Sequence, residues 1–145
     1  MLGSELEDLA RRFEACTLPK SAWTHAAHLA VGAWHVTHHG PDQALALLRA
    51  RIRRLNETHG VENSPSGGYH ETITAAYVRL IAAFLARFAV DVPLANRVTE
   101  LLASPLAQRD VLFRFWSREV LLGSAARSSW IEPDLHPLEL ARTDE

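Results

Sequence analysis

The sequence predicts an all-α protein: a single-domain helical bundle of five to six helices with an irregular C-terminal tail, spanning residues 1–145. Apolar residues recur at helical spacing along most of the chain, whereas strand-like alternation bounded by turn dipeptides is missing. Hydrophobic residues make up 48% of the sequence and charged residues 22%, which is typical of a folded domain rather than a disordered chain. A chain of 145 residues is long enough to bury one core of its own.

Six segments have helical periodicity and are bounded by capping residues, glycine or proline. We expect helices over about 4–16, 24–39, 41–58, 69–88, 93–103 and 110–122. Ser4, with Glu7 three residues later, is typical of a capping box, and Asp110 is placed to cap the sixth helix. The remaining residues are expected to form an extended tail that packs through Trp130 and Leu135 and frays at its end.

The charge and the composition bear on partners and location. A formal net charge of −2 gives no indication of a nucleic-acid partner. The chain opens without a signal segment and contains no run of 18 apolar residues, so no membrane span is expected. The single Cys16 excludes an intrachain disulfide framework and fits a reducing compartment. We therefore expect a cytoplasmic protein with a small-molecule substrate or ligand, and a homodimer is left open.

The second expected helix is almost wholly apolar, yet it carries three histidines. At about 100° per residue, His25 and His28 lie about 60° apart on one face, so both rings can reach one metal ion. His35 lies about 10.5 Å from His28 along the axis, which is a poor separation for sharing that ion. We interpret His35 as a hydrogen-bonding neighbour, a support for a ligand or a member of a second site. Gly32, on the same stripe, leaves room for another helix, a ligand or a substrate.

A loop over residues 59–68 leads directly into a second informative stretch, Tyr69–Thr74. By helical period, His70 lies on the core-facing side of the fourth helix, and Glu71 lies about 100° round from it. A glutamate in the first turn is also what the helix dipole favours, without any functional role. The pair is nevertheless suited to a metal ligand with its general base, or to two metal ligands.

We expect His25, His28, His70 and Glu71 to form a metal site between two helices, because bundles build metal sites from side chains on facing helices. Three histidines and one carboxylate suit a divalent transition metal, Zn(II) or non-haem Fe(II). Glu71 is then a fourth ligand or the base that takes a proton from metal-bound water or substrate. The His-Glu-x-x-His pattern of zincins is absent. Cys16 is either a small buried residue or a thiolate ligand.

The function that this site predicts is a small metal-dependent enzyme acting on a small molecule. Arg53, Asn56, Asn63 and Tyr69 are the candidate substrate-binding residues, and the other arginines of the third helix are expected to be mainly solvated. One alternative is a non-enzymatic helical protein that binds a metal or a small ligand in the same place. Another is a structural domain whose histidines only hydrogen-bond within the core.

Several motifs together resemble an uncharacterised family of small all-helical bacterial proteins. These motifs are Cys16-Thr17-Leu18-Pro19, Trp23-Thr24-His25-Ala26-Ala27-His28-Leu29 and Gly68-Tyr69-His70-Glu71-Thr72, followed by Arg127, Trp130, Pro133 and Asp134. The resemblance covers most of the chain and implies that these positions belong to one shared design, but it implies no activity. At the level of the fold alone, the chain also resembles the DinB-type helical bundles, which hold a metal with three histidines at a different spacing.

Overall fold

The computed structural model describes residues 1–144 and confirms the all-α class. Seven α-helices form in this part of the chain: α1 Gly3–Glu14, α2 His25–His39, α3 Pro41–Thr58, α4 Glu71–Leu85, α5 Leu94–Leu102, α6 Arg118–Leu121 and α7 Ser124–Ser128. Three short 3-10 helices lie between them, η1 Lys20–Ala22, η2 Pro105–Ala107 and η3 Val111–Arg114, and a fourth, η4 Leu140–Asp144, follows α7. No helix within the described range has both the length and the apolar character that crossing a membrane requires.

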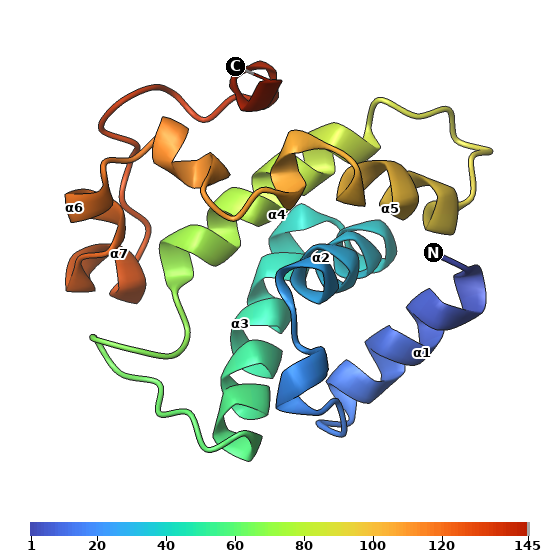
Figure 1. Ribbon diagram of the computed structural model, residues 1–145, viewed down its shortest axis with the longest axis horizontal. Coiled ribbons are helices and arrows are strands. Elements are labelled where there is room, and N and C mark those ends of the chain that lie inside the picture. Colours follow the sequence, from blue (N-terminus) through green and yellow to red (C-terminus); the bar gives the residue numbers. More distant parts are fainter. Residues whose placement is uncertain (145) are drawn as a thin grey trace.

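Helix α2 lies at the centre of the molecule, and α1, α3, α4 and α5 all pack against it (Figure 1). At Gly32 an added Cβ atom would lie 2.9 Å from Cδ1 of Ile81 on α4. The missing side chain therefore lets α2 and α4 approach closely. The room that the sequence predicts at Gly32 is occupied on this side by another helix.

Two adjoining apolar clusters form the core. The larger one joins α2, α4 and α5 to the C-terminal segments and includes the completely buried rings of Phe115 and Trp116. The smaller one joins α1, α2 and α3 around Phe13 and Leu55. Burial of such side chains contributes roughly 1.5–3 kcal/mol each, so tertiary packing rather than helix propensity stabilises the short helices.

Local capping determines where α2 begins, but it does not act at α1 as expected. The sequence offers Ser21 and Thr24 as alternative caps for this helix, and it is Thr24 that caps α2: its hydroxyl accepts the backbone N–H of Ala27 at 3.2 Å. The Ser4 cap is wrong: α1 begins at Gly3, which places Ser4 inside the first turn. The carboxylate of Glu5 instead accepts the N–H of Leu2 at 3.3 Å. Helix α4 ends at Leu85 rather than near residue 88, because the following turn tightens to i→i−3 hydrogen bonds.

The single helix expected over 110–122 is wrong. The chain there forms η3 and α6, separated by a bend at residues 115–117, and Asp110 makes no capping hydrogen bond. The hydroxyl of Ser117 caps α6 by accepting the N–H of Val120, while its own N–H donates to Asp134 at 2.8 Å. Trp116 is completely buried and donates its Nε1–H to the carbonyl of Ile131 at 2.9 Å. Contacts with the C-terminal segment therefore hold the bend.

The expectation for the tail is correct in one part. Trp130 packs edge-on against Trp116, with 5.6 Å between ring centroids, and joins the larger core cluster. Leu135, by contrast, is 50% exposed, so its side chain does not anchor the tail; its backbone N–H donates to the carbonyl of Phe115 at 2.9 Å instead. Residues 140–144 form η4 and bury Thr143 instead of fraying, and Glu145 lies outside the described residues.

His35 acts as a hydrogen-bonding group of the core. Its ring is completely buried; Nδ1–H donates to the carbonyl of Val31 at 2.8 Å, and Nε2 accepts an N–H of Arg51 at 2.8 Å. The pKa of His35 is lowered to about 4, chiefly by burial and also by the positive charge of Arg51. The hydrogen bond to Val31 acts in the opposite direction and raises it. The ring is therefore neutral at pH 7.

We expect the free energy of unfolding to decrease as the pH falls from about 6.5 towards about 4. In this range unfolded His35 takes up a proton, whereas the buried ring does not, and the full effect is roughly 3 kcal/mol. Urea midpoints followed by circular dichroism at intervals of pH measure it. The His35→Phe variant should show a shallower pH dependence of the free energy of unfolding, because it lacks the His35 contribution. Some dependence should remain, because His28 and His70 are present in both proteins. If the free energy of unfolding varied with pH to the same extent in both proteins, the pKa of His35 would not be lowered in the folded state.

Candidate functional site

A cavity of about 420 Å³ lies between α2, α3, α4 and the segment that contains η3 and α6. This volume is within the range of about 300–1,000 Å³ that small-molecule sites occupy. Most of the wall is apolar and comes from Trp23, Leu29, Gly32, Leu48, Ile52, Ile73, Val78, Ile81, Leu112, Phe113 and Leu121. The polar part of the wall comes from His25, His28, Thr74, Tyr77 and Arg109.

His25, the first predicted metal ligand, lies at the start of α2 and lines the cavity. Its Nε2–H donates to the carbonyl of Leu106 at 3.1 Å, and its ring meets the ring of Tyr77 edge-on at 5.5 Å between centroids. A carbonyl oxygen only accepts, so Nε2 carries the hydrogen. In the neutral ring, Nδ1 keeps a lone pair that can accept a hydrogen bond.

His28, the second predicted ligand, also lines the cavity. Its Nδ1–H donates to the carbonyl of Thr24 at 2.7 Å, and its ring stacks on Trp23 at 3.6 Å between centroids. Burial among protein atoms lowers the pKa of His28 to about 4; the Thr24 hydrogen bond raises it, and the charges of His25 and Arg109 lower it. Water still reaches the ring, as expected for a residue on a cavity wall. The ring is therefore neutral at pH 7, with Nε2 available as an acceptor.

His70, the third predicted ligand, does not line the cavity. It is the N-cap of α4 rather than a residue of its first turn, and its Nδ1 accepts the N–H of Ile73 at 3.1 Å. Its Nε2–H donates to the carbonyl of Leu121 at 2.7 Å, which fastens α4 to α6. Burial lowers the pKa of His70, so the ring is neutral and both of its nitrogens are already used.

Glu71, the predicted fourth ligand or base, forms a hydrogen-bonded ion pair instead. Its carboxylate accepts two N–H groups of Arg49, at 2.8 and 2.7 Å, and the hydroxyl of Tyr69 at 2.8 Å. The hydrogen bonds from Arg49 hold the pKa of Glu71 below its ordinary value. Arg49, which the sequence assigns to the solvated arginines, is therefore the partner that the sequence reasoning missed.

The structure brings His25 and His28 to one cavity and places His70 and Glu71 elsewhere. Within residues 1–144, no group of three or more His, Cys, Asp or Glu side chains could hold a metal ion. The thiol of Cys16 accepts a hydrogen bond from Arg54 at 3.3 Å and lies apart from the cavity wall. The arrangement does not fit a four-donor Zn or Fe centre, and a metal cofactor stays a prediction.

The predicted substrate-binding residues organise the loop over 59–68 rather than the cavity wall. Asn63 Oδ1 accepts the amide N–H of Asn56 at 3.1 Å and the backbone N–H of Tyr69 at 3.0 Å. The guanidinium group of Arg53 lies over the Tyr69 ring at 5.1 Å from its centroid. These contacts hold the loop where it enters α4.

Three polar residues of the cavity wall, Thr74, Tyr77 and Arg109, were missed as site residues. Helical period places Tyr77 on the core face, but nothing in the sequence separates it from an ordinary core aromatic. Burial raises the pKa of Tyr77, and the charge of Asp110 raises it further, so the phenol stays protonated and can donate. Arg109 lies in a short connection between η2 and η3 that has no recognisable motif. Only folding brings its charge near His28.

No family model, curated protein or solved structure matches this chain. The resemblance to an uncharacterised helical family therefore stays a prediction.

The His70→Ala variant separates a capping histidine from a metal ligand. We expect a loss of roughly 2 kcal/mol in the free energy of unfolding, because the carbonyl of Leu121 and the first turn of α4 lose their partners. Thermal unfolding with and without EDTA measures it, and the loss should be the same in both conditions. The His136→Ala variant, in the exposed tail, is the matched control. A metal-dependent melting temperature in the wild-type protein that His70→Ala abolishes would support the metal centre instead.

Proposed function

We propose that this protein binds a small, largely apolar molecule in the cavity between α2, α3, α4 and the η3–α6 segment. The observation that supports the proposal is the cavity itself, with a volume of about 420 Å³ and a mainly apolar wall. The cavity is open to solvent, so part of its apolar wall is in contact with water. An apolar ligand would remove that surface from water and gain packing contacts with it.

The polar groups on the wall fit recognition of a bound molecule. His28 offers an acceptor nitrogen, and the protonated Tyr77 hydroxyl offers a donor. A few such groups in an apolar wall orient a ligand without a large desolvation cost. These features fit a protein that binds a small molecule at this wall.

The metal-dependent reaction is the weaker candidate. Of its four predicted donors, His25 and His28 lie on the cavity wall, whereas both ring nitrogens of His70 are already used and Glu71 lies off the wall, paired with Arg49 and Tyr69. The non-enzymatic alternative, a helical protein that binds a small ligand, needs no such rearrangement.

The test is to fill the cavity. The Ile52→Trp variant places a larger ring on the α3 side of the wall, where Ile52 is half-buried. We expect the wild-type protein to bind the neutral fluorescent probe N-phenyl-1-naphthylamine saturably at one site, and Ile52→Trp to weaken binding roughly tenfold or more. Fluorescence titration measures the affinity, and circular dichroism checks the fold.

The Leu45→Trp variant is the matched control, because Leu45 is a half-buried residue of the same helix and lies away from the cavity wall. It should bind the probe as the wild-type protein does. Equal affinities for all three proteins, or no saturable binding by the wild type, would refute the proposed function.

A further inference from the structure

The charges on the cavity wall are not balanced. Of the sixteen residues that line the cavity, Arg109 is the one that is permanently charged, and no aspartate or glutamate is among them. The wall therefore presents a positive group beside an apolar interior. An apolar cavity for neutral molecules needs no such group.

Arg109 is exposed and unpaired at this position. Within residues 1–144 its guanidinium group makes no hydrogen bond and no ion pair, although Asp110 is its neighbour in the chain. The charge of Asp110 acts on Tyr77 instead, where it raises the pKa of the phenol. By contrast, Arg49 and Arg51, which are more buried, are both paired with carboxylates.

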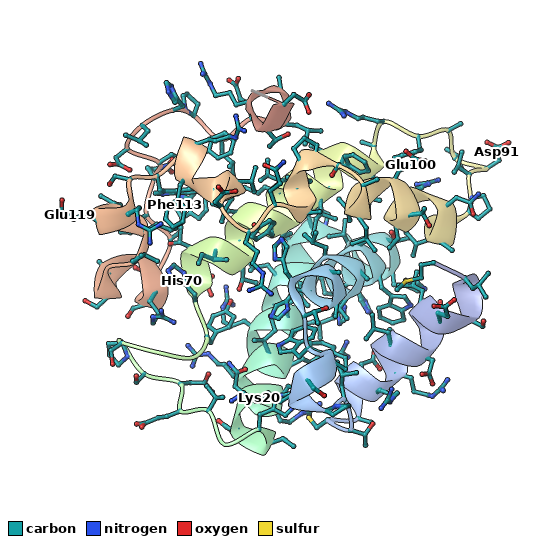
Figure 2. The ribbon with its side chains drawn as sticks, in the orientation of Figure 1. Lys20, His70, Asp91, Glu100, Phe113 and Glu119 are labelled. Carbon is teal, nitrogen blue, oxygen red and sulfur yellow. The ribbon has the colours of Figure 1, made fainter. Side chains whose placement is uncertain are left out.

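Further arginines lie next to the same side of the cavity. Phe113 belongs both to the cavity wall and to an adjacent surface depression that Asp110, Arg114 and Arg118 complete. The guanidinium group of Arg118 stacks over the Phe113 ring at 4.6 Å from its centroid. In Figure 2, Phe113 lies on the same side of the view as His70 and Glu119. Arg114 and Arg118 outnumber the one carboxylate, Asp110, among the residues that line this depression, and Arg109 lies on the adjoining cavity wall.

We infer that the cavity takes an amphipathic monocarboxylate, with its aliphatic or aromatic body between α2, α3 and α4 and its carboxylate on Arg109. The inference rests on the proposed function and adds the chemical class of the ligand. The planar guanidinium fork matches a carboxylate with two parallel hydrogen bonds. The neighbouring apolar wall strengthens the attraction, because it keeps water away from one side of the pair.

The test compares ligands that share one chain and differ in the head group: decanoate, decanol, decylamine and decyl phosphate. Binding of each ligand is followed by displacement of N-phenyl-1-naphthylamine from the wild-type protein. A second readout is the tryptophan fluorescence, to which Trp23 on the cavity wall contributes. We expect decanoate to bind about tenfold or more tightly than decylamine. The Arg109→Gln variant should lose roughly tenfold in affinity for decanoate and stay within about twofold for decanol.

Two further variants serve as controls. Arg109→Lys, which keeps the charge but not the fork, should retain part of the decanoate affinity. Arg87→Gln removes an exposed arginine just beyond the C-terminal end of α4, the end opposite the His70 cap, and should change no affinity.

The outcomes separate the two proposals. If decanol and decanoate bind equally and Arg109→Gln affects neither, the assignment of a carboxylate is overturned and the proposed function stands. If decyl phosphate binds much more tightly than decanoate and depends on Arg109 in the same way, a phosphate monoester replaces the carboxylate. If none of the four ligands binds, both proposals fail.

Discussion

The structure depends on one constraint: a histidine ring in or near the core must hydrogen-bond its N–H group. Leaving such a group buried without a partner costs roughly 1–3 kcal/mol. Four buried or half-buried rings meet the requirement in the same way, by donating to a backbone carbonyl: His25 to Leu106, His35 to Val31, His59 to Leu18 and His70 to Leu121; the exposed ring of His28 donates to Thr24 likewise. Two of these bonds join residues 81 and 51 positions apart, so they also tie α2 and α4 to the C-terminal segments.

The same constraint decides which ring nitrogens remain available for chemistry. A ring that donates from one nitrogen offers the other as an acceptor when it is neutral. His35 uses its acceptor for Arg51, and His70 uses its acceptor for the first turn of α4. His25 and His28 leave theirs at the cavity wall. His35 and His70 are therefore structural histidines, whereas His25 and His28 can each accept a hydrogen bond from a ligand.

The cavity arises from the way the helices meet around α2. Gly32 brings α2 close to α4 at Ile81, while α3 and the η3–α6 segment close the remaining sides. Phe113 comes from η3 and Arg109 from the connection between η2 and η3, so neither lies on a long helix. These two short segments place a cation and an aromatic ring beside an apolar interior.

The sequence by itself determined the all-α class, the approximate extent of α2 and α3, two candidate caps for α2 and the position of His25 and His28 on one face. These features follow from helical periodicity, capping chemistry and the Gly40–Pro41 break, all of which act between neighbouring residues.

Tertiary structure decided the partners of His70 and Glu71, the bend within 110–122 and the presence of Arg109 on the cavity wall. Spacing along a chain shows which residues share one helix face, but it does not show what another element places opposite that face. A carbonyl 51 residues away and an arginine 22 residues away became partners only when the helices packed. For this reason the sequence identified polar residues that require partners, and the fold determined which partners they have.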